Sequence, residues 1–440
     1  MRIVRGAANA RAALSENRSV SVDRVSPGVL AKTQEVFGEP LTPTEVVQRI
    51  LRQVRDGGDG AVRDLTRRLD GIELEDLEVP ASAVAGAYEV VPADVVEALK
   101  LAARRIREFH EASRPKSWMD ASNGYGVMIN PVGRVGAYVP GGTASYPSTV
   151  LMTVIPAKVA GVDEVFVCTP CRGDDMPPPV VLVAADIAGA DRVYRLSGAQ
   201  AIAAMAYGTE SVPRVDTICG PGNIFVTLAK KLLFGEVGID GLYGPTETAI
   251  VADESANPTL CAADLLAQAE HDVLARSVLI TTSERLAEEV NKEIDTRLER
   301  LDRADIARAA LDDRGCIAIV DDLDQALDLA DDFAPEHLSL MVREPSSYVG
   351  RVRNAGVVFL GEFSHEVLGD YVAGPSHVMP TSGTARFGSG LGVHSFVKFT
   401  PIVALDDDVS AELSRAASVI ARAEGLTAHA EAAEVREELL

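Results

Sequence analysis

The chain has 440 residues with a formal net charge of −23, and 47% of its residues are hydrophobic. A chain of this length exceeds what one hydrophobic core supports, so we expect two or more domains. The negative charge argues against a nucleic-acid partner, and no apolar stretch reaches the roughly 20 residues that would cross a membrane, so we expect no membrane partner either.

The N-terminal region is predicted to be an arm over residues 1–27. Its first 20 residues contain four arginines but no continuous apolar run of the kind that marks a secretory signal. A helical pattern follows from about residue 43 to 112. Thr42 and Thr44 offer caps before apolar positions at helical spacing, and a second helix is predicted over 92–109.

The middle of the chain alternates short apolar runs with helical patterns. The predicted strands are 134–139, 164–168, 193–196 and 215–219, and the predicted helices are 148–160, 180–187, 199–207 and 223–234. Such alternation, joined by glycine-rich turns, predicts βαβ units in a parallel sheet. Right-handed crossovers would place the carboxyl ends of the strands at one ligand-binding edge. Residues 172–179 are predicted to be a surface loop.

A second alternating series predicts another parallel sheet. Its strands are expected at 248–252, 277–282, 316–320, 338–342 and 357–360. The tail then changes character, with helices predicted over 410–424 and from Thr427 to the end of the chain. These two helices have little core of their own, so they need something to pack against, and another subunit is one candidate.

The five cysteines are an odd and sparse count that indicates a reducing compartment, so we expect a cytoplasmic protein. Cys168 and Cys171 form the only Cys-x-x-Cys pair. No second pair completes a zinc site, and the pair follows an apolar run where a strand would end. We therefore interpret both residues as structural cysteines.

The helix predicted after Asn257-Pro258 carries two candidate metal ligands. Gln268 and His271 are three residues apart, which places them on one helix face. Imidazole nitrogen is a good zinc ligand and an amide oxygen a weaker one. The alternative is a polar helix end, with the histidine near the negative pole of the helix dipole.

Two further segments carry candidate catalytic groups. Pro335 disfavours a helical backbone at the residue before it, so Glu336 and His337 are predicted to lie where a helix passes into a strand. A carboxylate beside an imidazole can divide two proton-transfer roles, although an exposed pair in an acidic loop would look the same. In the segment 369–377, Asp370 could ligate a metal and His377 could contact substrate, or the segment is a plain turn.

Nucleotide-binding fingerprints are incomplete. No Gly-x-Gly-x-x-Gly follows the first strand, no P-loop is present, and the glycines at 388–392 have the wrong spacing and no preceding strand. Two turns remain as candidates, at 197–200 and 220–223. Both place backbone N–H groups at a helix start, where an anionic cofactor could sit.

Taken together, these segments resemble the histidinol dehydrogenase family. The resemblance covers about residues 28 to 430, and its motifs are 137–142, 198–202, 220–223, 239–247 continuing to 268–271, and 335–338. It implies oxidation of L-histidinol to L-histidine by way of the aldehyde, with two NAD+ reduced in succession. It also implies one zinc ion per site, held by Gln268, His271 and Asp370 together with His429 of the partner subunit.

The resemblance also implies roles for individual residues. His337 would take the alcohol proton, and Glu336 would activate water in the second oxidation. The implied substrate contacts are Thr246, Gln268, His271, His337, Asp370, His377, Glu424 and His429, and the implied NAD contacts are Tyr138, Gln200 and Asn223. Glu424 and His429 would come from the partner subunit of an intertwined homodimer.

The expected fold is α/β, with two similar but incomplete Rossmann-like parallel-sheet domains and helical extensions at both ends. The expected division is an arm over 1–27, a first domain over 28–137 and 247–390, a second, NAD-binding domain over 138–246, and a tail over 391–440 exchanged between subunits. One rival function is a zinc hydrolase with Glu336 as general base, which needs an open metal position and no nicotinamide. Another is a non-catalytic metal-binding scaffold, against which the intact Glu336-His337 pair argues.

Overall fold

The computed structural model describes residues 1–16, 33–141, 144–171 and 176–439. The chain divides into two units, one of residues 1–113 and 132–396 and the other of residues 114–131 and 397–440. The first unit contains two parallel sheets covered by helices, which confirms the predicted α/β class. Among the described residues, no helix is both long and apolar enough to cross a membrane.

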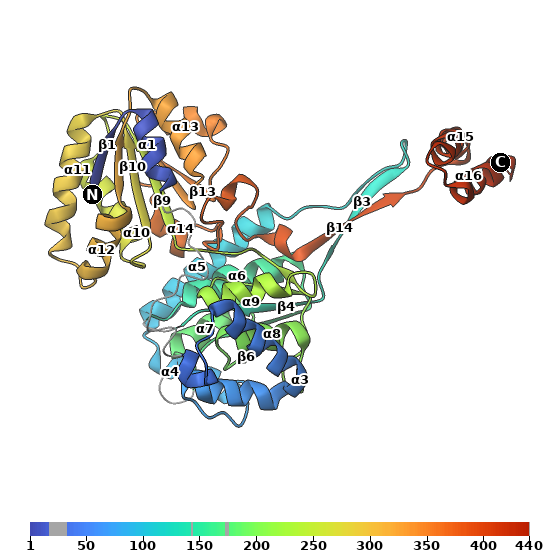
Figure 1. Ribbon diagram of the computed structural model, residues 1–440, viewed down its shortest axis with the longest axis horizontal. Coiled ribbons are helices and arrows are strands. Elements are labelled where there is room, and N and C mark those ends of the chain that lie inside the picture. The colour runs from blue at the N-terminus through green and yellow to red at the C-terminus, as the bar shows by residue number, and fades with distance from the viewer. Residues whose placement is uncertain (17–32, 142–143, 172–175, 440) are drawn as a thin grey trace. The chain divides into compact units, whose positions relative to one another are not determined.

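The larger sheet has six parallel strands in the order β1-β11-β10-β9-β12-β13 (Figure 1). Its strands are β1 (Arg2–Arg5), β9 (Glu247–Ala252), β10 (Arg276–Thr281), β11 (Cys316–Ile319), β12 (His337–Met341) and β13 (Val357–Leu360). The strands β9, β10 and β12 are buried along their whole length because helices cover both faces of the sheet. The second predicted series of strands is thereby confirmed.

Helices pack on both faces of this larger sheet. One face is covered by α10 (Pro258–Ala269), α11 (Glu284–Leu298) and α12 (Ala304–Arg314), and the other by α1 (Ala7–Ser15) and α13 (Leu323–Phe333). Alternate residues of β9 enter the two cores, so that Ile250 packs on the α10 side and Ala249 on the α13 side. The connecting segments contain α14 (Glu366–Tyr371) and the short 3₁₀ helices η1 (Pro345–Arg351), η2 (Thr384–Arg386) and η3 (Val393–Phe396).

Residues 1–16, expected to belong to an arm, instead form β1 and α1 of the larger sheet. In Figure 1, β1 (blue) lies in one sheet with strands from the second half of the chain (yellow and orange). It pairs with β11 from Arg2 opposite Cys316 to Arg5 opposite Ile319. A strand of four residues is too short to show an alternating pattern, so the sequence does not predict it. The rest of the expected arm, residues 17–27, lies outside the described residues.

The smaller parallel sheet has five strands in the order β6-β5-β4-β7-β8. Its strands are β4 (Arg134–Tyr138), β5 (Glu164–Cys168), β6 (Arg192–Tyr194), β7 (Thr217–Cys219) and β8 (Gly238–Ile239), and its helices are α6 (Pro147–Ala160), α7 (Pro179–Ala188), α8 (Gly198–Tyr207) and α9 (Ile224–Leu233). The predicted alternation is confirmed, with β8 as an addition. Residues 172–175 of the predicted surface loop lie outside the described residues.

The helices α3 (Pro43–Asp70), α4 (Ala81–Val90) and α5 (Ala93–Ala112) pack on the smaller sheet's helices. The first contacts α8 and α9, while α4 and α5 contact α7 and α6. This differs from the expected division, in which residues 28–137 join the larger sheet, because Val47 and Ile50 of α3 share a core with Ile202 of α8. Helical periodicity predicts an apolar face but not the surface that covers it.

The second unit combines two distant stretches of the chain. The strands β2 (Trp118–Asp120), β3 (Tyr125–Pro131) and β14 (Val397–Val403) form an antiparallel sheet in the order β14-β3-β2, and α15 (Asp407–Ala423) packs against α16 (Thr427–Leu439). The two predicted tail helices are confirmed. The tail expected over 391–440 is not wholly helical, however, because β14 pairs with β3 along its entire length.

Candidate active site

Glu336 and His337 lie where α13 passes into β12, as the sequence predicted. Ala334 ends the helix with a left-handed backbone (φ 43°), Pro335 follows, and His337 is the first residue of the strand. Both side chains are nearly buried, with exposed fractions of 7% for Glu336 and 3% for His337. The interpretation of this pair as exposed loop residues is therefore wrong.

The carboxylate of Glu336 is held by the start of the neighbouring strand β9. Its Oε2 accepts hydrogen bonds from Thr246 Oγ1 at 2.5 Å and from the backbone N–H of Glu247 at 3.1 Å. Burial raises the pKa of Glu336 to about 7, against the opposing effects of His337 and of these two hydrogen bonds. A carboxyl group with a pKa near neutrality can both accept and return a proton.

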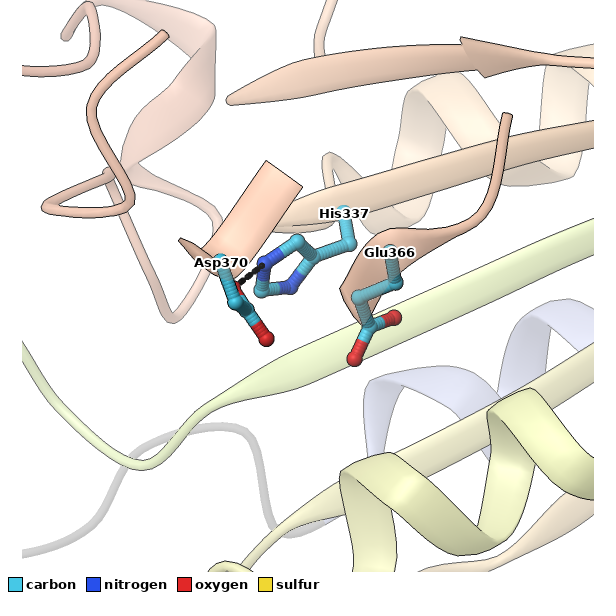
Figure 2. A group of neighbouring side chains, drawn as sticks. All are labelled: His337, Glu366 and Asp370. Atoms are coloured by element: carbon cyan, nitrogen blue, oxygen red, sulfur yellow. Dashed lines mark ion pairs between the residues drawn. The ribbon is translucent and has the colours of Figure 1, made fainter. Parts of the chain in front are cut away.

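The imidazole of His337 is oriented by a backbone carbonyl on one side and a carboxylate on the other. Nδ1 lies 3.3 Å from the carbonyl oxygen of Glu247, which can only accept, so this nitrogen carries a hydrogen in that contact. Nε2 lies 3.4 Å from Asp370 Oδ1, an ion-pair contact drawn in Figure 2. Burial disfavours the charged ring, but Glu366, Glu336 and Asp370 together outweigh it and raise the pKa of His337 to about 10.

Glu366 is a site residue that the sequence reasoning missed. Its carboxylate, 1% exposed, lies with His337 and Asp370 in a group whose possible ligand atoms are all within 4.8 Å of one another (Figure 2). Burial raises the pKa of Glu366 to about 8. The spacing of Glu366 and Asp370, four residues apart on the short helix α14, was the available signal.

Gln268 lies in the last turn of α10 and faces the same site. Its Nε2 donates to Thr246 Oγ1 at 2.6 Å, so the amide, the hydroxyl and the Glu336 carboxylate form one hydrogen-bonded series. Its Oε1 is buried and accepts no hydrogen bond within the described part of the chain. A buried amide oxygen without a donor is an unfavourable arrangement that a cation would correct.

His271 lies outside the helix that carries Gln268, because α10 ends at Ala269 and Glu270 caps it. The histidine is exposed in the turn that follows, where it interacts electrostatically with Asp370 and His377. In the site itself, Asp370 keeps a lowered pKa although burial opposes it, because the ring of His337 stabilises the carboxylate. Three of the four predicted metal ligands thus border one region, and only Asp370 belongs to the three-residue group of Figure 2.

His377 is also brought to this region. Its Nδ1 lies 2.9 Å from the carbonyl oxygen of Asp370, and its Nε2 lies 3.1 Å from Thr149 Oγ1. Burial lowers the pKa of His377, so the neutral ring is favoured. Glu424 and His429 belong to the second unit, where both are exposed, Glu424 at the end of α15 and His429 on α16.

The family model of histidinol dehydrogenase matches residues 39–437 of the chain. This chain belongs to the histidinol dehydrogenase family. Histidinol dehydrogenase of Dehalococcoides mccartyi is 49% identical over 436 residues, which are 98% of this chain and 99% of that protein. The enzyme of the same name from Deinococcus radiodurans is 48% identical over 440 residues, 99% of this chain and 100% of that protein.

A solved structure supports the same assignment. The crystal structure of histidinol dehydrogenase from Elizabethkingia anophelis covers 100% of this chain and 98% of its own, with 31% identity and a TM-score of 0.91. The family resemblance stated from the motifs is thereby confirmed, and the chain is an enzyme of the oxidoreductase class.

In this histidinol dehydrogenase family member, the predicted cofactor residues lie at the carboxyl edge of the smaller sheet, with Tyr138 as the last residue of β4 and the other two in the segments that follow β6 and β7. The Tyr138 hydroxyl accepts from the N–H of Gly198 at 3.1 Å, at the start of α8. Gln200 is buried and donates through Nε2 to Asp70 Oδ2 at 3.2 Å. Asn223 caps α9, accepting through Oδ1 from the first N–H groups of that helix. The structure therefore shows each of these side chains fixing a turn.

Proposed function

We propose that this chain oxidises L-histidinol to L-histidine through the aldehyde. Two NAD+ molecules would be reduced in succession, and each active site would hold one zinc ion. The observation that carries the proposal is the hydrogen-bonded series Gln268–Thr246–Glu336 beside His337, which places two proton-transfer groups and an unsatisfied ligand oxygen together. Membership of the histidinol dehydrogenase family supports the choice of substrate. When bound, NAD+ supplies the hydride acceptor.

In the first oxidation, His337 accepts the proton of the alcohol through Nε2. Its other nitrogen faces the Glu247 carbonyl, so Nε2 is the atom available for proton exchange. Against the effect of burial, Glu366, Glu336 and Asp370 raise the pKa of His337 to about 10, and zinc held by Asp370 would offset one of these negative charges and so favour the neutral ring that accepts the proton. The hydroxyl oxygen loses its proton and the carbon that bears it loses a hydride, which leaves the aldehyde.

In the second oxidation, Glu336 accepts a proton from the water that adds to the aldehyde carbon. The resulting hydrate anion loses a hydride to give the carboxylic acid, which loses one further proton to give the carboxylate of histidine. The pKa of about 7 gives Glu336 a substantial ionised fraction at neutral pH, and Thr246 and Glu247 hold one of its oxygens in place. The two residues thus act in different halves of the reaction.

Zinc would be held by Gln268 Oε1, His271 and Asp370, with His429 of the partner subunit as fourth ligand. The donor set of one amide oxygen, one carboxylate and two imidazoles suits zinc, and the buried Oε1 of Gln268 is satisfied by such a bond. The ion would grip the imidazole and amino groups of the substrate and so hold the alcohol carbon near His337. Thr246, His377 and the partner subunit's Glu424 would complete the substrate contacts.

We further propose that the second unit mediates an intertwined homodimer with shared active sites. Helices α15 and α16 bury little between them, and large apolar side chains on their surface are strongly exposed, among them Leu413, Val419, Ile420, Leu426 and Val435. Apolar residues gathered on so small a unit favour a protein partner. A cytoplasmic location stays a prediction from the cysteine content.

A single assay tests the proposed function against the hydrolase and scaffold alternatives. Purified protein is mixed with zinc, L-histidinol and NAD+, and NADH is followed by absorbance while histidine is quantified. We expect two NADH per histidine. Absence of NADH would refute the dehydrogenase, and one NADH per histidine would refute the two-step scheme. A zinc hydrolase using Glu336 as general base would need no NAD+ at all.

A further inference from the structure

The turn after β7 brings two backbone segments into unusually close contact. Gly220 has a φ of +106°, in the region that favours glycine, and a Cβ added there would lie 2.0 Å from the carbonyl oxygen of Tyr138. Three residues later, Asn223 caps α9. This turn therefore holds the ends of β4 and β7 so close together that a residue with a Cβ atom at position 220 would not fit.

A fully buried ion pair holds the turn from beneath. Lys230 on α9 and Asp240 after β8 are 2% and 0% exposed, and their charged groups are in direct contact. Lys230 Nζ donates to the carbonyl oxygen of Gly220 at 3.1 Å, and Asp240 Oδ2 accepts from the N–H of Gly220 at 2.7 Å. Both polar backbone groups of Gly220 are thus bound by the two members of one ion pair.

Stability alone does not explain this pair. Removing two charges from water costs about as much as their attraction returns, and a buried pair is often replaceable by apolar side chains without loss of stability. What such side chains could not supply is the directional contact with Gly220, together with the further hydrogen bond from Gly241 N to Asp240 Oδ1 at 2.9 Å. The pair determines the conformation of the turn more than it strengthens the core.

The same pair also reaches toward the catalytic residues. Lys230 Nζ lies 4.9 Å from the ring centre of Tyr243, a cation–π contact, and the carbonyl oxygen of Tyr243 accepts from Thr227 Oγ1 of α9 at 3.3 Å. Three residues beyond Tyr243, Thr246 donates to Glu336. One buried charge therefore contacts both the turn that precedes Asn223 and the segment that leads into the catalytic site.

We propose that Lys230 and Asp240 are positioning residues for the nicotinamide cofactor. The ion pair holds the Gly220 turn in the conformation that binds the cofactor, and it fixes the position of that turn relative to Thr246 and Glu336. The inference rests on the proposed NAD-linked function. The affinity for NAD+ and NADH should therefore depend on this pair, whereas the affinity for histidinol should depend on residues of the larger sheet. Neither residue touches the reacting atoms.

The test uses the full-length zinc-loaded enzyme and the variants Lys230→Met, Asp240→Asn and the double variant Lys230→Met/Asp240→Leu. For each, the KM values of NAD+ and histidinol are measured, with the Kd of NADH from its fluorescence. We expect the KM of NAD+ and the Kd of NADH to rise at least about tenfold while the KM of histidinol stays within about twofold. The double variant leaves no unpaired buried charge, so it keeps the test available if a single variant fails to fold.

Glu164→Gln is the control, in an ion pair that is partly exposed. Arg134 and Glu164 form an ion pair of 2.5 Å at the amino ends of β4 and β5, in the same sheet but at the opposite edge. Loss of this ion pair in Glu164→Gln should leave the KM of NAD+ unchanged. A similar rise in the control would mean that any weakened ion pair loosens the sheet, and would overturn the proposal.

Two further results would overturn it. One is a folded double variant with wild-type affinity for NADH, and the other is an equal rise in the KM of NAD+ and of histidinol. Hydrogen exchange over residues 215–226 provides a readout independent of activity, with faster exchange expected in all three variants. Because the wild type is assayed first, a wild type without NADH formation refutes the proposed function, whereas an active wild type with unaffected variants refutes only the role of the pair.

Discussion

The two parallel sheets of the first unit present their proposed functional residues at opposite edges. In the smaller sheet, Tyr138 ends β4, and the turns at 197–200 and 220–223 follow the carboxyl ends of β6 and β7. In the larger sheet, Thr246 immediately precedes β9 and His337 opens β12, so the proposed catalytic residues lie at the amino ends. The proposed cofactor residues thus lie at the carboxyl edge, where ligands are expected in a parallel sheet, whereas the proposed catalytic residues lie at an amino edge.

The helices explain why both edges are useful. At the carboxyl edge of a parallel sheet the next helix begins, so α8 and α9 offer N–H groups and a positive dipole end, which suit an anionic cofactor. At the amino edge the preceding helix ends, so α10 and α13 offer carbonyl groups and a negative dipole end. A metal ion or an imidazolium would be stabilised there. One fold repeated twice can thus provide an anion site and a cation site.

The largest expected effect concerns the amino edge of the larger sheet. Glu336→Gln keeps the hydrogen-bonding shape but removes the base, so aldehyde oxidation should slow by about 10²–10⁴-fold. Alcohol oxidation, which depends on His337, should slow far less. Single-turnover rates starting from histidinol and from histidinaldehyde measure the two steps separately. Equal loss in both would contradict the division of roles between Glu336 and His337.

A pair of buried glutamines, one at each edge, tests the comparison directly. Gln268 and Gln200 are 0% and 1% exposed, on α10 and α8 respectively. Gln268→Leu should weaken zinc binding at least about tenfold, because it removes a ligand oxygen, and should leave the Kd of NADH unchanged. Gln200→Leu should raise the Kd of NADH and leave zinc binding unchanged. Chelator competition measures zinc affinity and NADH fluorescence measures the cofactor. If both variants affect both ligands, the two edges do not act separately.

The pH dependence of the second oxidation should report Glu336. Burial raises its pKa to about 7, so the protonated form, which cannot act as a base, accumulates as the pH falls through this value. The rate of aldehyde oxidation should therefore fall about tenfold per pH unit below the pKa. In Glu336→Gln the inflection near pH 7 should vanish. An unchanged inflection in that variant would assign the titration to another group.

Mixing two inactive chains tests whether the second unit completes the site of a partner subunit. Gln268→Ala and His429→Ala chains, unfolded and refolded together, should give heterodimers with one intact site of two. Random pairing makes half of the dimers heterodimers, so about a quarter of wild-type activity should return. Each variant refolded alone is the control. No recovery in purified heterodimers would show that every chain closes its own site.

The smallest expected effect concerns Asn223 at the carboxyl edge. Its side chain caps α9 in the structure, so Asn223→Ala should destabilise the protein by about 1 kcal/mol. In a protein of this size that corresponds to a fall in Tm of about 2–4 °C at most. Asn223→Asp retains the cap and should restore the Tm. If Asn223→Asp keeps the Tm but weakens NADH binding, the amide itself contacts the cofactor.

Much of the fold could be predicted from local sequence. Apolar runs alternating with helical periodicity indicated both parallel sheets, and Pro335 placed Glu336 and His337 between a helix and a strand. Patterns of this kind depend on interactions within a few turns or along one strand, and these are written in neighbouring residues. The family motifs then identified the enzyme class, because they span nearly the whole chain.

Other features depended on contacts between distant residues. Only the tertiary structure showed that residues 2–5 pair with β11, that α3 packs on the smaller sheet, and that β3 pairs with β14. It also placed Glu366 beside His337 and moved His271 off the helix of Gln268. The sequence by itself determined most helices and strands of the two parallel sheets and indicated the candidate catalytic groups other than Glu366. The tertiary structure decided at which edge of each sheet those groups meet, because burial and strand pairing join residues that no local pattern connects.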